Sequence, residues 1–209
     1  MKRRQIMLGT AALATLAVGG GAFLMPNPAR AEEQVFEDDR ILGDPAAPVT
    51  IIEYASLTCP HCARFHSDTL PPLKDSWIKD GRARLVYRDY PLDRVALTGA
   101  MIAHCFDGDR AYFAFVDMLY QQQARWSRAE NPLEELASLA KIGGMSRERF
   151  DACLQDEAQL NRILEKLKHA QETYKIEATP SFVIGGEVYR GGRSFEDLEK
   201  ILEGVAPKT

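Results

Sequence analysis

Residues 49–62 read VTIIEYASLTCPHC, and this stretch decides the fold class. Residues 49–54 are β-branched and apolar, which is typical of a buried strand. Residues 56–58 end that strand. A helix is expected to begin near Cys59, with Pro60 at an early helical position where its missing N–H costs nothing. The two cysteines of this CxxC motif are therefore predicted to lie at the junction between a strand and a helix.

Further elements follow on both sides of this junction. The pattern predicts strands at 83–88, 181–184 and 187–190, and the turn Gly185-Gly186 makes the last two a hairpin. Pro71 and Pro72 are expected to interrupt or kink the first helix. Apolar residues at helical spacing, together with capping residues, predict later helices over 112–119, from Asn131 to Gly143, from Ser146, over 160–167 and from Ser194.

The order of these elements is βαβ, a block of helices, and then ββα. It predicts an α/β fold with one mixed sheet, helices on its faces and an inserted helical subdomain with its own small core. We assign 32–48 to a polar leader, 49–90 and 176–209 to the two parts of the sheet domain, and 91–175 to the helical insertion.

The N-terminus is expected to be an export signal. Residues 1–31 contain Lys2, Arg3 and Arg4, an apolar stretch and an A-x-A cleavage motif that ends at Ala31. The arginine pair leaves both the Sec and the Tat route open, and an uncleaved membrane anchor is the alternative reading. Export predicts a periplasmic protein, in a compartment where disulfides persist.

Composition excludes several classes of protein. With 45% hydrophobic and 27% charged residues the chain is ordinary for a globular domain, which excludes wholesale disorder. The net charge is -4 and the pI is about 5.6, without the basic footprint of a nucleic-acid-binding protein.

The CxxC motif carries the chemistry. Cys59 is placed at a helix N-terminus, where unpaired N–H groups and the helix dipole favour a thiolate. Cys59 is therefore predicted to be the exposed nucleophile and Cys62 the resolving thiol. Cys62 follows one turn later on the same face, so a disulfide between the two can close. A stabilised Cys59 thiolate is a good leaving group, and His61 adds an imidazole that can lower its pKa further.

Other readings of the motif fit less well. A zinc site needs four ligands and no second closely spaced pair is present, so we expect no metal and no cofactor. Residue 63 is alanine, which excludes the C-x-x-C-H haem pattern. A purely structural disulfide is the remaining alternative. His66 is interpreted as an ordinary residue of the helix surface, and His104 and His169 as structural or solvated residues.

The combination of strand, CPHC, helix, helical insertion and Thr179-Pro180 before a hairpin resembles the DsbA-type branch of the thioredoxin superfamily. The resemblance covers about residues 40–205 and implies a thioredoxin-like fold. It implies that Pro180 is cis and faces the active-site disulfide, and that the backbone preceding it pairs with substrate. It also implies that Glu53 is buried beneath Cys62 and relays protons. The alternative is that Glu53 points to solvent.

Cys105 and Cys153 form the second pair of cysteines. If Cys59 and Cys62 bond to each other, these two can form a disulfide that ties two helices of the insertion. The alternative is a pair of buried free thiols. The candidate site therefore comprises two groups beside this structural disulfide: catalytic residues Cys59, Pro60, His61, Cys62 and Glu53, and substrate-binding residues Thr179 and Pro180.

The leading hypothesis is a monomeric periplasmic thiol oxidase that introduces disulfides into reduced or unfolded exported polypeptides. The resemblance implies reoxidation by a quinone-linked, DsbB-like membrane protein. A reductase or isomerase on the same scaffold is the alternative. A binding module on a redox-dead scaffold is a third reading, and the intact Cys59 and Cys62 speak against it.

Overall fold

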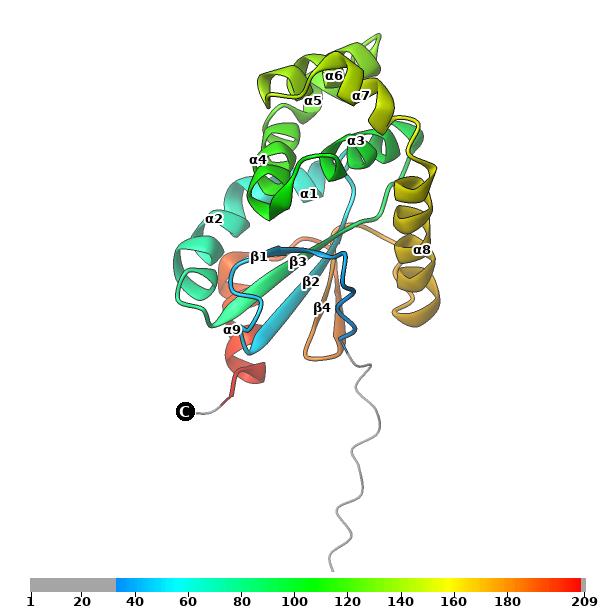
Figure 1. Cartoon of the computed structure of the whole chain (residues 1–209). Helices are drawn as coiled ribbons and strands as arrows, with labels where there is room; N and C mark the ends of the chain where they lie inside the picture. Colours follow the sequence, from blue (N-terminus) through cyan, green and yellow to red (C-terminus); the bar gives the residue numbers. More distant parts are fainter. Residues whose placement is uncertain (1–32, 208–209) are drawn as a thin grey trace, which may run out of the picture.

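The computed structural model describes residues 33–207 (Figure 1). The expected export signal, residues 1–31, lies outside the described residues. Among residues 33–207 no helix is both long and apolar enough to cross a membrane. The strands are β1 Arg40–Leu42, β2 Val49–Ala55, β3 Ala83–Asp89, β4 Ser181–Ile184 and β5 Glu187–Arg190. The helices are α1 Pro60–Arg64, α2 Leu70–Leu73, α3 Arg94–His104, α4 Gly108–Gln121, α5 Gln123–Trp126, α6 Pro132–Ile142, α7 Arg147–Cys153, α8 Glu157–Thr173 and α9 Phe195–Val205.

The strands form one mixed sheet in the order β1-β3-β2-β4-β5. β2 and β3 are parallel, as a strand–helix–strand unit requires, and the β4–β5 hairpin is antiparallel and joins the sheet through β2. This is the thioredoxin-like α/β fold expected from the sequence. Glu53 pairs in register with Tyr87 on one side and with Phe182 on the other.

Alternation along β2 directs its side chains to two different helical layers. Val49 and Ile51 pack in a cluster with α2 and α9, whereas Ile52 and Tyr54 pack with Ala170 at the end of α8. In Figure 1, α8 runs beside the sheet, and α3 to α7 gather at one end of the molecule. Glu53 shares its face with Ile51 and so points toward the helix that follows Cys59.

The leader contributes to the sheet, which the sequence assignment of 32–48 did not anticipate. Arg40–Leu42 pairs antiparallel with β3 as an edge strand. The neighbouring Asp39 is buried and binds Arg88, with 2.7 Å between Asp39 Oδ2 and Arg88 Nη2. A strand of this length is too short to produce a recognisable alternation, and the nearby acidic residues favoured a solvated segment.

The helix after Cys59 is not interrupted at Pro71 and Pro72. It continues from Pro60 to Ile78 by alternating α1 and α2 with two π-helical stretches, Phe65–Thr69 and Lys74–Ile78. The N–H of Leu70 donates to Phe65 O, five residues back, so the winding widens just before the two prolines. The prolines therefore stand where the chain has already left the regular α-helical hydrogen-bonding pattern, and the helix runs on.

Helices α3 to α8 occupy the segment assigned to the insertion, 91–175. The insertion was expected to have a core of its own, but its core is continuous with that of the sheet domain. One buried cluster joins Phe115, Leu119 and Trp126 of the insertion to Cys59 and Cys62 at the strand–helix junction. The two cysteines thus lie where the sheet domain and the helical segment share a core.

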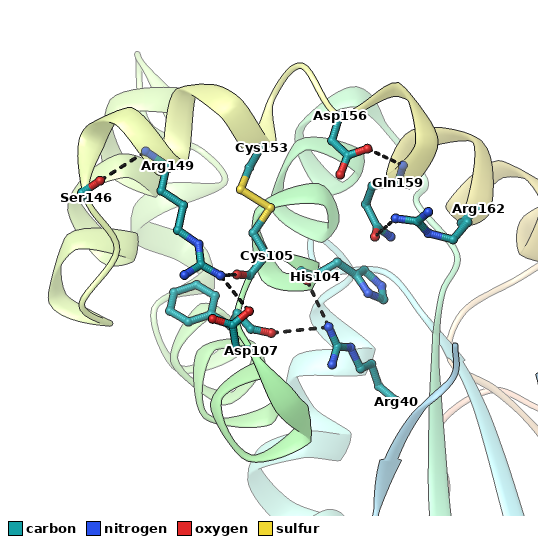
Figure 2. Close-up of a disulfide and its surroundings, with 11 residues drawn as sticks. Arg40, His104, Cys105, Asp107, Ser146, Arg149, Cys153, Asp156, Gln159 and Arg162 are labelled. Carbon is teal, nitrogen blue, oxygen red and sulfur yellow. Dashed lines mark hydrogen bonds and ion pairs between the residues drawn. A yellow bond between two sulfur atoms is a disulfide. The ribbon is translucent and has the colours of Figure 1, made fainter. Parts of the chain in front are cut away.

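A disulfide between Cys105 and Cys153 ties the end of α3 to the end of α7, with an S–S distance of 2.04 Å and a sequence separation of 48 (Figure 2). Beside it, Arg149 donates to the carbonyl oxygen of Cys105 and pairs with Asp107 at 2.9 Å. The carbonyl oxygen of the adjacent His104 accepts a hydrogen bond from Arg40 of β1, which connects this corner to the edge of the sheet.

Candidate active site

Cys59 caps the helix at the end of the turn that follows β2. Its N–H donates to Ser56 O at 3.0 Å, and its carbonyl oxygen accepts from Ala63 N–H at 3.1 Å. Pro60 occupies the first helical position, as the sequence predicts. Both Cys59 and Cys62 are free thiols in this structure. Because the chain turns directly from a buried strand into the helix, the two sulfurs are held at one fixed end of the sheet.

The two thiols differ in accessibility less than expected. Cys59 was predicted to be exposed, but it is only 5% exposed, and Cys62 is 0% exposed. Packing of the insertion against the junction covers both of them. Cys59 remains the more accessible of the two residues, which favours Cys59 as the one that an incoming thiol reaches first.

The environment lowers the pKa of the Cys59 thiol to about 5. The main cause is a hydrogen bond from the Cys62 thiol, which outweighs burial, and the neighbouring Thr179 side chain lowers the pKa further. The backbone N–H groups of Cys62 and His61, unpaired at the start of the helix, also stabilise the thiolate. Cys59 is thus a thiolate at neutral pH.

Cys62 has the opposite character. Burial raises its pKa well above the usual value for a thiol, and the hydrogen bond to Cys59 and the negative charge of Glu53 raise it further. Cys62 therefore holds its proton when the pair is reduced. An attack by Cys62 requires that this proton be removed, and its departure as a leaving group requires that a proton be returned.

Thr179 and Pro180 meet the cysteines from the far end of the chain. The Thr179–Pro180 peptide bond is cis, and the carbonyl oxygen of Thr179 lies 3.4 Å from Cys59 Sγ. The next residue, Ser181, begins β4, which pairs with β2. Sheet pairing therefore brings the candidate substrate-binding residues against the candidate nucleophile.

The imidazole of His61 is exposed. It lines a surface groove beside the active site together with Arg64, Asp68 and Arg193. The contribution of residue 61 to the Cys59 thiolate includes its backbone N–H, one of the unpaired N–H groups expected at the start of the helix. Position 61 thus acts on the thiolate partly through the main chain.

Glu53 is fully buried and does not point to solvent, so the alternative reading of this residue is wrong. Its Oε2 lies 3.2 Å from Nε2 of His66. Its other carboxylate oxygen has no hydrogen-bond partner among the described residues. The charge of Glu53 raises the pKa of Cys62, and the His66 that Glu53 contacts lies one turn after Cys62 along the same helix.

His66 was interpreted as a helix-surface residue, and this interpretation is wrong. Its side chain is 2% exposed and lies between Glu53 and Asp117. Its position four residues after Cys62, one helical turn along the same face, is the signal that could have identified it. Gln123 was also missed: its side-chain amide donates to the carbonyl oxygens of Leu57 and Cys59, at 2.8 and 3.0 Å.

The arrangement of the two thiols suits thiol–disulfide chemistry. Within residues 33–207, no group of three or more His, Cys, Asp or Glu side chains is placed to hold a metal ion. The ring nitrogen Nε2 of His104 lies 2.8 Å from Asp89 Oδ2. His169 packs against the rings of Phe36 and Tyr174.

Comparison with known proteins gives consistent results. The family model described as thioredoxin matches residues 36–204. A Rickettsia bellii protein named "Putative protein-disulfide oxidoreductase" is 29% identical over 153 residues, which are 73% of this chain and 59% of the relative. The Rickettsia felis protein of the same name is 27% identical over 176 residues, 84% of this chain and 63% of the relative. The chain thus spans about three fifths of the length of these relatives.

Two solved structures extend the comparison. Alpha-DsbA1 of Wolbachia pipientis is 27% identical with a TM-score of 0.79, and the match covers 84% of this chain and 94% of that chain. A structure described as a protein-disulfide isomerase from Novosphingobium aromaticivorans is 26% identical with a TM-score of 0.69, covering 80% of this chain and 97% of that chain.

Proposed function

The chain belongs to the thioredoxin family, and from this membership we propose that it is a protein-disulfide oxidoreductase whose reactive pair is Cys59 and Cys62. One observation carries the proposal. Two thiols one helical turn apart have opposite acidities, with the pKa of Cys59 lowered to about 5 and that of Cys62 raised. A nucleophilic or leaving thiolate beside a protonated partner is the arrangement that thiol–disulfide exchange uses.

The proposed reaction begins with the oxidised protein. A substrate thiolate attacks Cys59 Sγ, the Cys59–Cys62 bond breaks, and the Cys62 sulfur leaves and takes up a proton. A second substrate thiolate then attacks the substrate sulfur of the mixed disulfide. The substrate leaves as a disulfide, and the Cys59 sulfur leaves as a thiolate. The low pKa of Cys59 favours this last step because a weakly basic thiolate is the better leaving group.

The direction we propose is oxidation of substrate. Stabilising the Cys59 thiolate stabilises the reduced protein, and a disulfide whose reduced form is stable is a strong oxidant. The proposed substrates are reduced or unfolded exported polypeptides, paired along the backbone preceding Pro180. The proposed setting is the periplasm, and the proposed reoxidant is a quinone-linked, DsbB-like membrane protein acting on a monomer. The Cys105–Cys153 disulfide supports an oxidising compartment.

A reductase or isomerase is the second candidate. The isomerase description of the Novosphingobium structure favours it, since that chain shares the fold and 26% of the sequence. The same cysteine pair would serve either role, and only the reduction potential and the fate of the mixed disulfide distinguish the two.

Two measurements test the proposal. Equilibration of the Cys59–Cys62 pair with a glutathione buffer is expected to leave the protein largely reduced under conditions that keep a reductase oxidised. An insulin-reduction assay reports reductase activity directly. A pair that stays oxidised in that buffer and reduces insulin rapidly would assign the reductase role.

Trapping tests the assignment of the two cysteines. Cys62→Ser is expected to accumulate mixed disulfides with substrate through Cys59, because no second thiol releases them. Cys59→Ser is the matched control and is expected to accumulate none. Trapping through Cys62 in the Cys59→Ser protein would reverse the two roles.

A further inference from the structure

Proton transfer to and from Cys62 presents a structural problem. Cys62 must gain a proton when its sulfur leaves in the proposed reaction and lose one when the pair is reoxidised, yet Cys62 is 0% exposed. Glu53, whose charge acts on that thiol, is also 0% exposed. A proton that moves between Cys62 and Glu53 is therefore still inside the protein, and a further group must exchange it with water.

His66 provides that group. Its Nε2 lies 3.2 Å from Glu53 Oε2, and its Nδ1 lies 3.5 Å from Asp117 Oδ1. The imidazole is the one side chain type that can accept a proton on one ring nitrogen and release it from the other. Here the two nitrogens face two different carboxylates, one inner and one outer.

Asp117 extends the chain of contacts to the surface. Its side chain is 30% exposed, whereas that of His66 is 2% exposed. Asp117 Oδ2 also pairs with Lys74 Nζ at 2.9 Å, and Lys74 is itself 30% exposed. The contacts therefore run from a fully buried carboxylate through a buried imidazole to a carboxylate in contact with water.

We propose that Glu53, His66 and Asp117 form a proton relay between the Cys62 thiol and solvent. This proposal rests on the proposed redox function. When Cys62 attacks a mixed disulfide, its proton passes to Glu53 and the proton on His66 Nδ1 passes to Asp117 and to water. Glu53 then holds the proton from Cys62, beside a neutral imidazole that keeps its remaining proton on Nε2. The reverse sequence delivers a proton when the Cys62 sulfur leaves. No electron pair is exchanged in the relay, because the sulfur atoms carry the redox change.

The surroundings of His66 keep this path defined. The ring centroid of Tyr120 lies 4.2 Å from that of the imidazole, and the ring centroid of Tyr87 lies 5.7 Å from it. The ring of Phe65 packs edge-on against the imidazole as well. Burial raises the pKa of both tyrosines well above the usual value, so their hydroxyls stay neutral. The ionisable groups that face His66 and change charge are therefore Glu53 and Asp117, with Cys62 and Lys74 beyond them.

Charge within the relay favours a protonated imidazole. Burial by itself lowers the pKa of His66, but the charge of Glu53 and the hydrogen bonds with Asp117 and Glu53 outweigh burial and raise it. The imidazolium thus carries a proton on Nδ1 that it can release to Asp117 and water when Glu53 takes the proton of Cys62. An imidazolium between two carboxylates also explains how Glu53 is tolerated in an apolar sheet.

A single time course separates the relay from the redox function. The reduced protein is mixed with one equivalent of the aromatic disulfide dithiobis-nitrobenzoate, which releases a coloured thiolate at each exchange. The first release reports attack by the Cys59 thiolate. The second reports attack by Cys62 on Cys59 Sγ, the step that needs the relay. The variants are His66→Gln and Asp117→Asn, whose amides are similar in size but cannot carry the proton.

We expect the first release to be unchanged and the second to slow about 10-fold or more near neutral pH. In the variants, the rate of the second release should keep rising with pH in the range where the wild-type rate has become constant. The reason is that hydroxide must remove the Cys62 proton when the relay is broken. In His66→Ala, added imidazole should restore part of the rate. Asp117→Asn, at a half-exposed site, keeps the test available if substitution of buried His66 prevents folding.

His104→Gln is the matched control, because His104 also pairs with a buried carboxylate, Asp89, but is not connected to Cys62. It should leave both releases unchanged. A second release with wild-type rate and pH profile in both His66→Gln and Asp117→Asn would overturn the relay. Loss of the first release in the wild-type protein would instead overturn the proposed redox function.

Discussion

The carbonyl oxygen of Thr179 lies 3.4 Å from Cys59 Sγ, although 120 residues separate the two in the chain. The contact exists because β4 pairs with β2 and so brings the start of the hairpin to the end of the strand that leads into Cys59. Through its side chain Thr179 also helps to lower the pKa of Cys59. The segment proposed to bind substrate thus also tunes the thiol that reacts with it.

Thr179→Val should therefore raise the pKa of Cys59, because it removes the hydroxyl and keeps the shape of the side chain. The expected result is a shift of the alkylation rate profile and of the ultraviolet absorbance of the thiolate toward higher pH. Thr179→Ser keeps a hydroxyl and serves as the control, with a smaller shift. An identical pKa in the wild type and in Thr179→Val would show that the hydroxyl has no part in stabilising the thiolate.

The free energy of unfolding of the reduced protein, relative to the oxidised protein, should fall as the pH is lowered. The pKa of Cys59 is lowered from 9.0 to about 5 in the folded protein. A lowered pKa adds stability that is fully present above the unfolded value and is lost as pH falls through the folded value. The reduced form should therefore lose its advantage over the oxidised form between about pH 9 and about pH 5.

Urea unfolding of both redox forms across this range measures the difference. The oxidised form, in which Cys59 does not titrate, is the internal reference. An oxidised form that is the more stable at neutral pH would indicate a protein suited to reduce its substrates and would favour the reductase assignment.

Substitutions at position 61 should separate the imidazole from the main chain. His61→Ala keeps the backbone N–H that stabilises the Cys59 thiolate, whereas His61→Pro removes both this N–H and the imidazole. We expect His61→Pro to raise the pKa of Cys59 more and to lower the reduction potential more than His61→Ala. A change of 30 mV corresponds to about 1.4 kcal/mol for this two-electron couple. Equal effects of the two substitutions would assign the whole contribution to the imidazole.

The Cys105–Cys153 disulfide should stabilise the fold independently of the reactive pair. Its closed loop of 48 residues corresponds to at most about 4 kcal/mol in the chain-entropy model. Replacing both cysteines by serine should lower the free energy of unfolding toward this limit, as measured in urea with the reactive pair kept reduced. Mild reduction should release only the thiols of Cys59 and Cys62. Release of all four thiols from the folded protein would contradict a structural role.

The buried ion pair of Asp39 and Arg88 should be sensitive to the loss of one partner. Both side chains are 0% exposed, and Lys166 approaches Asp39 as a second cation at 3.0 Å. Arg88→Met should lower the free energy of unfolding by about 3 to 5 kcal/mol, because it leaves a buried carboxylate with one weaker partner.

The double variant Asp39→Leu, Arg88→Met removes both charges and should recover part of this loss. Chemical denaturation of the single and double variants measures both effects. The double variant could instead be less stable than Arg88→Met, by as much again as Arg88→Met is less stable than the wild type. That result would show that the two residues do not act as a pair.

Elements whose signals are local could be predicted from the sequence. The CPHC junction, the Gly185-Gly186 hairpin and the capping residues Asn131, Ser146 and Ser194 lie where they were expected, and each of these caps accepts the N–H three residues later. The edge strand β1 was missed because so short a strand depends on the neighbour that it pairs with. The prolines Pro71 and Pro72 do alter the helix, but as a change of winding and not as the interruption that the sequence also allowed.

The sequence by itself determined the reactive chemistry, since a CxxC motif at the start of a helix fixes two thiols one turn apart and exposes one of them to unpaired N–H groups. Only the tertiary structure decided which ionisable side chains lie between the buried thiol and the surface. Glu53, His66 and Asp117 come from a strand, a helix and the inserted segment, and their contacts at 3.2 and 3.5 Å exist only when these elements pack together. Local patterns specify backbone conformation through near neighbours, whereas the burial of a carboxylate and the partner of an imidazole depend on residues far away in the chain.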